Sequence, residues 1–196
     1  MIHCDRARPL HYFTEEGWEG HGITQILEAI QPHGWRDEDA MERGSVLHSA
    51  CACVALGMEP EVPPYFQADP ELFAAWLSQY RRWFGDRVRD VVAAEELAQL
   101  DRLHVATRLD LLCRMDTGPL TLVELKTGQP SPLHAMQLHA QRKMVERLEK
   151  RAAMTILYLQ PDSYHEVSVS WNPRTWGTFE SMAIAQWNAY QFRQKG

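Results

Sequence analysis

The chain lacks several features that would assign it to a class of protein at once. Its longest nearly apolar run, residues 50–58, is far too short to cross a bilayer, which takes about 20 residues. The first residues contain no apolar core of a secretory signal, so we expect a cytoplasmic protein without a membrane partner. The four cysteines, Cys4, Cys51, Cys53 and Cys113, are therefore expected to be reduced thiols.

Excess positive charge is also missing. The chain has 20 Lys and Arg against 26 Asp and Glu, a net charge of -6 and a pI near 5.8. This balance excludes a protein that coats nucleic acid by bulk charge, but it allows contact through a small site. There is no phosphate-binding loop of the Walker type and no Gly-x-Ser-x-Gly elbow, so neither an ATP-driven motor nor a serine hydrolase of that kind is indicated.

The composition is that of an ordinary globular protein, with 45% hydrophobic and 23% charged residues in 196. Hydrophobic periodicity predicts helices over 23–30, 45–56, 70–84, 133–151 and 175–192, and strands over 88–92, 105–113, 120–127, 155–159 and 166–170. This order predicts an α/β fold with a mixed central sheet flanked by helices. We expect one domain over 1–196, with an N-terminal helical part at about 22–85, an α/β core at about 88–170 and a closing helix at about 175–192.

One predicted hairpin carries most of the chemistry. Its strands contain Arg108-Leu109-Asp110 and Val123-Glu124-Leu125-Lys126, and residues 115–119 form a turn signal between them. A tight turn centred on Thr117 places Asp110 opposite Glu124, with the two carboxylates about 5 Å apart on one face. Like charges at that distance need an offset, and a divalent cation is the natural one.

Carboxylate oxygens suit Mg²⁺ or Mn²⁺, which stabilise charge on a phosphate and lower the pKa of bound water. Lys126, on the same face as Glu124, could orient that water or neutralise charge in the transition state. The alternative from these residues alone is a surface hairpin in which Lys126 simply pairs with Glu124.

Other short motifs accompany the hairpin in a fixed order. Gly44-Ser45-Val46-Leu47-His48 comes before it, and Gln137 follows on the next predicted helix. Together with Arg108-Leu109-Asp110-Leu111-Leu112 and Glu124-Leu125-Lys126-Thr127-Gly128, these motifs resemble the PD-(D/E)XK nuclease superfamily, in particular its RecB-type exonuclease branch and phage-type exonucleases. The resemblance runs from about Gly22 to Leu159 and implies the restriction-endonuclease-like fold.

The resemblance implies roles for the matching residues. It makes Asp110 and Glu124 metal ligands, with the Leu125 carbonyl as a possible third, and gives Lys126 the water-orienting role. His48 would be a further ligand or a hydrogen-bonding group beside the metal. Without the other motifs, a histidine packed in the core would be the better interpretation.

Two further roles follow from the same resemblance. Gln137 would face the site and help to position substrate or Lys126. A glutamate on the preceding strand usually completes such a site, and Glu95 is preferred here over Glu96.

The chain departs from the family at two points. Many members have Tyr four residues after the helical Gln, whereas this chain has Gln141. Some relatives hold an iron–sulfur cluster through cysteines near the C-terminus, and no cysteine follows Cys113, so no such cluster is expected. On the same predicted helix, Gln141, Lys143 and Arg147 are candidate nucleic-acid contacts, with a solvated helix face as the alternative.

The implied activity is metal-dependent hydrolysis of phosphodiester bonds in DNA. An exonuclease acting on DNA ends during phage-type recombination or repair is the first expectation, in the cytoplasm of a bacterial or phage-infected cell. A recombinase, annealing protein or helicase would be its partner. A structure-specific endonuclease of the same fold and a non-cleaving nucleic-acid-binding module are the alternatives. The complete set of Asp110, Glu124 and Lys126 favours the enzyme.

Overall fold

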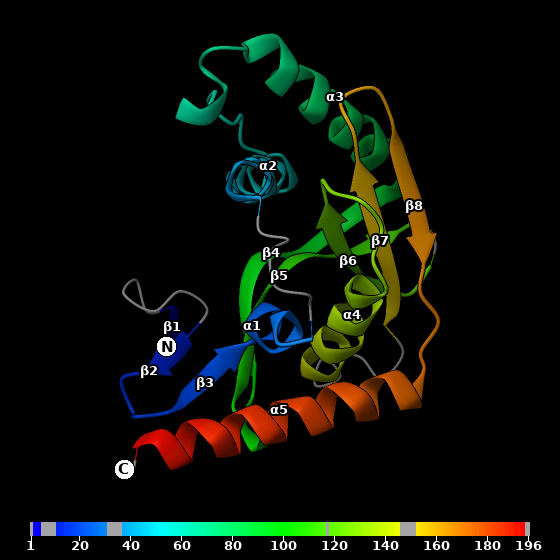
Figure 1. Ribbon diagram of the computed structural model, residues 1–196. Helices are drawn as coiled ribbons and strands as arrows, with labels where there is room; N and C mark the ends of the chain where they lie inside the picture. The colour runs from blue at the N-terminus through cyan, green and yellow to red at the C-terminus, as the bar shows by residue number, and fades with distance from the viewer. Residues whose placement is uncertain (1, 5–10, 31–36, 117, 146–151, 195–196) are drawn as a thin grey trace.

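The structure is a computed structural model that describes residues 2–4, 11–30, 37–116, 118–145 and 152–194. Its centre is a mixed β-sheet with helices on both faces (Figure 1). The strands are β1 (Ile2–Cys4), β2 (His11–Thr14), β3 (Glu19–Gly22), β4 (Val88–Leu100), β5 (Val105–Met115), β6 (Leu120–Lys126), β7 (Ala153–Leu159) and β8 (Tyr164–Ser168). The helices are α1 (Ile23–Glu28), α2 (Glu38–Ala55), α3 (Pro70–Arg87), α4 (Pro132–Val145) and α5 (Pro173–Gln194), with the 3-10 turns η1 (Pro64–Phe66) and η2 (Asp101–Leu103).

On one edge of β5 the neighbouring strands β3 and β6 leave residues 107–110 unpaired in the described ladders, and we call this opening of the sheet the fork. The antiparallel strand β4 pairs with β5 along almost its whole length, and therefore occupies one edge of β5. On the other edge, β3 pairs in parallel at residues 105–106, and β6 pairs antiparallel at residues 111–114. In the ladders of the described residues, 107–110 of β5 have no strand partner on this second edge. Asp110 therefore lies where β6 and β5 separate.

The hairpin register predicted from the sequence is confirmed. β5 and β6 pair Leu111 with Val123 and Leu112 with Leu122, so Asp110 and Glu124 are the next residues in the same register. The turn is closed by the backbone N–H of Gly118, which donates to Met115 O at 2.8 Å. Thr117, on which the predicted turn is centred, lies outside the described residues.

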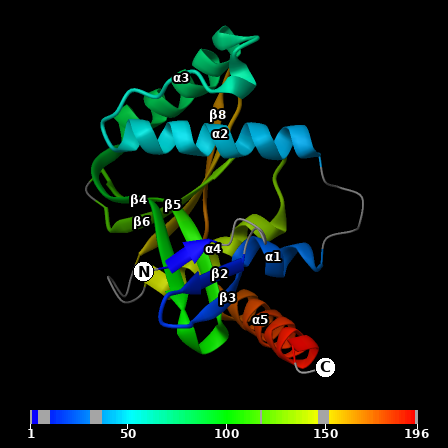
Figure 2. The ribbon, with the colours of Figure 1, turned by 90° about the vertical axis from the view of Figure 1, so that its left-hand side faces the viewer.

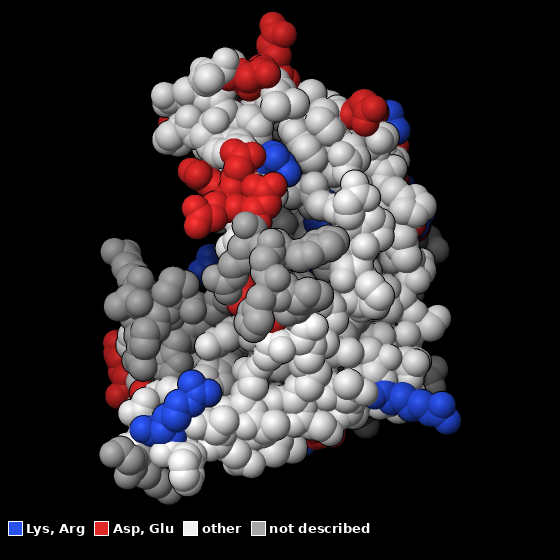
Figure 3. Space-filling model, viewed as in Figure 1, with Lys and Arg blue, Asp and Glu red and all other residues white. Residues whose placement is uncertain are grey.

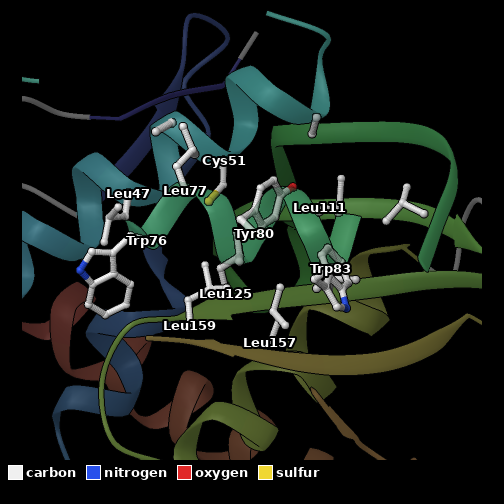
Figure 4. Close-up of a cluster of buried hydrophobic side chains, with 14 of the residues drawn as sticks. Leu47, Cys51, Trp76, Leu77, Tyr80, Trp83, Leu111, Leu125, Leu157 and Leu159 are labelled. Carbon is white, nitrogen blue, oxygen red and sulfur yellow. The ribbon is translucent and has the colours of Figure 1, made fainter. Parts of the chain in front are cut away.

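Alternate residues of the central strands face two different helical layers. One face packs against α2 and α3 and buries an aromatic-rich cluster that includes Trp76, Tyr80, Trp83, Leu125 and Leu157 (Figure 4). Figure 2 shows α2 lying lengthwise over the sheet with α3 beyond it. The aromatic residues Trp76, Tyr80 and Trp83 of α3 are thus part of the core.

The opposite face of the sheet packs against α4. Leu112, Leu122 and Ile156 from three neighbouring strands meet Leu138 and Val145 of this helix. A third cluster joins α1, α4 and α5 through residues such as Ile26, Met144 and Phe179. Since Glu124 and Lys126 are even-numbered like Leu122, their side chains point to the α4 side.

Several predicted boundaries need correction. α2 begins at Glu38 rather than residue 45, because the Asp37 carboxylate accepts the Ala40 backbone N–H at 3.1 Å and caps the helix. β4 extends to Leu100 rather than residue 92, and α4 is described to Val145, beyond which the predicted helical residues 146–151 lie outside the described part.

The sequence pattern predicts no strand in the first 22 residues, but these residues contain β1, β2 and β3. Each of these strands has only three or four residues, too few for an alternating pattern to stand out. Within the described residues, no helix is long and apolar enough to span a membrane.

Candidate active site

Asp110 is the centre of a buried polar group at the fork of the sheet. It is 8% exposed, and both of its carboxylate oxygens have partners. Oδ1 lies 3.1 Å from His48 Nδ1 on α2, and Oδ2 accepts the backbone N–H of Leu125 at 2.7 Å. The hydrogen bond to Leu125 connects β5 and β6 just beyond Leu111 and Val123, their last paired residues. It fixes the Asp110 carboxylate at the fork of the sheet.

His48 reaches this point because α2 passes close to the end of β6. A Cβ built on Gly44 would lie 3.4 Å from Thr127 Oγ1, which is van der Waals contact, so this face of α2 lies against the end of β6. Gly44 and His48 are four residues apart and share one helix face. The face of α2 that lies against the end of β6 at Gly44 is therefore the face that presents His48 to Asp110.

Glu95 lies on β4, opposite Asp110 in the β4–β5 ladder. Ala94 pairs with Leu111 and Glu96 with Leu109, which leaves Glu95 facing Asp110 between them. Glu95 has a φ of +54°, in the left-handed region that residues other than glycine rarely adopt. Backbone strain of this kind is concentrated at functional sites, where the surrounding structure holds it in place.

These three residues fit a divalent cation. One ligand atom from each of His48, Glu95 and Asp110 can be chosen such that all three lie within 4.8 Å of one another. Two carboxylates and an imidazole form a ligand set that suits Mg²⁺ or Mn²⁺, with the remaining positions open to water or phosphate.

The pKa shifts show how strongly these groups act on one another. Burial and the nearby Asp110 charge raise the pKa of Glu95. Burial alone would raise the pKa of Asp110, but the His48 charge and hydrogen bond outweigh it and lower that pKa. Burial lowers the pKa of His48, and the charge and hydrogen bond of Asp110 raise it by more, so that it is raised overall. The two carboxylates thus repel each other in a poorly solvated place.

A second polar network lies beside the first and involves β6 and α4. Lys126 Nζ donates to Glu124 Oε1 at 2.7 Å and to Gln137 Oε1 at 3.1 Å. Gln141 Nε2 donates to Glu124 Oε2 at 2.8 Å. Glu124 is 1% exposed and Gln141 0% exposed, so this network is closed from solvent on the α4 side.

Burial and neighbouring charges both act on this network. Burial and the Asp110 charge raise the pKa of Glu124 despite the opposing effect of Lys126. Burial would lower the pKa of Lys126, but the charges of Glu124 and Asp110 raise it overall, so that the ammonium stays protonated. A permanent positive charge is therefore held next to the candidate cation site.

The geometry separates the predicted site residues into two groups. His48, Glu95 and Asp110 form the candidate metal group, whereas Glu124 lies with Lys126 and Gln137 and is not a member of that group. Leu125 offers Asp110 its backbone N–H, which the sequence pattern did not indicate.

The predicted nucleic-acid contacts lie in other surroundings. Gln141 is buried against Glu124, and Lys143 Nζ lies 4.9 Å from the Trp171 ring centroid and 5.8 Å from that of Trp176. Arg147 lies outside the described residues.

His134 of α4 belongs to none of the motifs described above, yet it lies beside this network. Its Nδ1 lies 3.0 Å from the hydroxyl of Tyr158, the β7 residue that pairs with Lys126. Burial, and then the Lys126 charge, lower the pKa of His134 to about 4. The spacing of His134 and Gln137, three residues apart on one helix, was the available signal for this neighbourhood.

Acidic side chains gather over the end of α2 in the view of Figure 3. The first turns of this helix carry the exposed residues Asp37, Glu38, Asp39 and Glu42. A DNA backbone would be repelled by this patch. The end of α2 seen in this view is therefore an unfavourable place for DNA to bind.

The sheet with its fork, the flanking helices and the site at the fork define the class of fold. It is the α/β fold with a mixed central sheet and flanking helices that the sequence predicts, and it matches the fold of solved exonuclease structures. No protein-family model matches the chain, and no curated protein matches it.

Two of the solved structures that this chain resembles are of one enzyme. The alkaline exonuclease LHK-Exo from Laribacter hongkongensis has a TM-score of 0.50 and 15% identity, over 90% of this chain and 93% of that one. LHK-Exo in complex with dAMP has a TM-score of 0.50 and 14% identity, over 88% of each chain. At this identity the likeness establishes the fold, and the activity has to be argued from the site.

Proposed function

We propose that this protein is a divalent-cation-dependent deoxyribonuclease that hydrolyses phosphodiester bonds, and that it acts as an exonuclease on DNA ends. The observation that carries the proposal is the group formed by His48, Glu95 and Asp110, whose ligand atoms lie within 4.8 Å of one another. Asp110 is buried, His48 and Glu95 are partly buried, and Glu95 has a strained backbone, so this group is costly for a fold to keep without a function. The likeness in fold to an alkaline exonuclease supports the same activity.

The proposal assigns the cation to His48, Glu95 and Asp110, with Glu124 and the Leu125 carbonyl as further candidate ligands. Mg²⁺ or Mn²⁺ bound there would supply positive charge to stabilise a phosphate during in-line attack and to lower the pKa of water. Asp110 has its orientation set by Leu125 N–H and by His48, so it needs no rearrangement to present a lone pair.

The chain's own residues have separate tasks in this account. Lys126 keeps its charge and holds it at a fixed place through Glu124 and Gln137, where it orients the attacking water or offsets charge on the phosphate. Gln137 accepts a hydrogen bond from the ammonium and thereby restricts its direction. Such preorganisation is effective because it requires no reorganisation during the reaction.

DNA rather than RNA is the proposed substrate, and recombination or repair in a bacterial or phage-infected cell is the proposed setting. A recombinase, an annealing protein or a helicase would be the partner that supplies DNA ends or uses the product. The net charge of -6 supports a partner, since the chain itself has no surplus of basic residues to grip DNA broadly.

A digestion series tests the proposal. Purified protein is incubated with linear and circular DNA, single- and double-stranded, the linear forms end-labelled, with Mg²⁺ or Mn²⁺ added or with chelator. An exonuclease releases nucleotides from linear DNA only, and only with metal. Cutting of closed circles would favour the endonuclease alternative. A protein inert on all forms, but able to bind them, would favour the non-cleaving module.

A further inference from the structure

Helix α4 offers two glutamine amides to one ion pair. Gln137 uses its carbonyl oxygen to accept from Lys126, and Gln141, one turn later, uses its amide N–H to donate to Glu124. The acceptor end of one amide thus meets the cation, and the donor end of the other meets the anion. The two glutamines lie four residues apart on the same face of the helix.

The Gln141 amide is held in one orientation by Glu124. A flip of the amide would place Oε1 against the carboxylate oxygen that Nε2 now contacts at 2.8 Å, which replaces attraction by repulsion. In the observed orientation Gln141 Oε1 is buried and has no hydrogen-bond partner among the described residues. A buried acceptor without a partner costs stability.

The surroundings of Gln141 argue against direct contact with substrate. Its side chain is 0% exposed, and Glu124 beside it is 1% exposed. A residue in this position cannot reach a DNA strand on the surface. Its one polar contact in the described structure is with a carboxylate that also bonds Lys126.

We propose that Gln141 is a positioning residue of the nuclease reaction, which acts through Glu124. By fixing Oε2 it leaves Oε1 to face the Lys126 ammonium, and it sets where the Glu124 charge lies relative to His48, Glu95 and Asp110. This inference rests on the proposed function, and it replaces the expectation that Gln141 contacts nucleic acid.

The test variant is Gln141→Met, which keeps the length of the side chain and removes the donor. We expect kcat on linear DNA to fall by about 10- to 100-fold, while KM and the Kd for DNA in chelator change by less than about twofold. A role in DNA contact predicts the opposite split, with a raised KM and Kd and an unchanged kcat, and that result would overturn the proposal.

A double-mutant cycle tests whether Gln141 acts through Glu124. The affinity for Mn²⁺, measured by electron paramagnetic resonance of the free ion, is compared for wild type, Gln141→Met, Glu124→Gln and the double variant. Gln141→Met should weaken Mn²⁺ binding about tenfold in wild type and less than about twofold in the Glu124→Gln protein. An equal loss in both backgrounds would mean a general structural effect and would overturn the proposal.

Gln186→Met is the matched control, because Gln186 also donates its amide, to Ile26 O at 3.1 Å, but on α5 away from these residues. It should keep the wild-type kcat and Mn²⁺ affinity. Gln141→Leu serves in place of the Met variant if the latter does not fold. A wild-type protein that neither binds Mn²⁺ nor cleaves DNA would overturn the proposed function itself. An active wild type with a fully active Gln141→Met would overturn this inference alone.

Discussion

His48 Nδ1 and Asp110 Oδ1 lie 3.1 Å apart, although the two residues are separated by 62 positions in the chain. This contact connects α2 to the fork of the sheet and joins the helical N-terminal part to the α/β core. The Asp110 carboxylate is 8% exposed, so its charge is supported by the protein rather than by water. The site is built on a helix and two strands, which hold it more rigidly than loops would.

Replacement of His48 by Gln should weaken Mn²⁺ binding by about tenfold or more, because a neutral imidazole nitrogen is a better ligand than an amide oxygen. Titration of Mn²⁺ against the variant checks this. His165→Gln, a change of an exposed histidine on β8, is the control and should bind Mn²⁺ like wild type. Equal affinity of the His48 variant and wild type would exclude His48 as a ligand.

Lys126→Met should lower the free energy of unfolding by about 2–3 kcal/mol, less than for a fully buried pair because the Lys126 side chain is 21% exposed. The loss arises because Glu124 is left charged and buried without its cation. Adding Glu124→Gln should recover most of the loss, since the stranded charge is then removed. Urea unfolding of wild type, Lys126→Met, Glu124→Gln and the double variant measures both effects. No recovery in the double variant would show that the ion pair is not the cause.

Glu95→Gly should separate function from stability. Glycine adopts a φ of +54° without strain, which stabilises the folded protein, but it also adds conformational entropy to the unfolded chain. Because these effects oppose each other, the free energy of unfolding should change by less than about 1 kcal/mol. Mn²⁺ affinity should nevertheless fall, because a ligand is lost. Glu96→Gly, at the exposed neighbour, should do the reverse: it should cost about 1 kcal/mol and leave Mn²⁺ binding intact. Unchanged Mn²⁺ binding in Glu95→Gly would remove Glu95 from the site.

His134 makes the stability depend on pH. Its pKa is about 4 in the folded protein, against about 6.5 in an unfolded chain, so between these values the unfolded state binds a proton that the folded state does not. The contribution of His134 is therefore fully present above pH 6.5 and is lost as the pH falls towards 4. His134→Gln should flatten the curve of unfolding free energy against pH in this window. An identical slope in variant and wild type would contradict the assignment.

The hairpin could be predicted closely because its register depends on local features. A short turn signal and two apolar strands determine which residues face each other, so Asp110 and Glu124 were placed in register from spacing alone. The order of the motifs can also be read directly from the sequence. It placed His48 and Gln137 in the predicted site, and the structure has them in contact with Asp110 and Lys126.

The orientation of side chains could not be predicted in the same way. Glu124 turns towards Lys126 and Gln141 rather than towards His48. The reason is that α4, which packs on this face of the sheet, supplies the amide donor of Gln141. The left-handed backbone at Glu95 has no sequence signal, since the residue is not glycine. Contacts made by packing of distant elements therefore needed the structure.

The most direct test of the central claim is cleavage of end-labelled linear duplex DNA by wild type and by Asp110→Asn, each with Mg²⁺ and with chelator. Asparagine can still accept the Leu125 N–H, so the fold should be kept while the charge is lost. We predict that wild type releases nucleotides only with Mg²⁺, and that Asp110→Asn is inactive with an unchanged unfolding midpoint. Cleavage by Asp110→Asn at the wild-type rate, or cleavage by wild type in chelator, would contradict a cation site at Asp110.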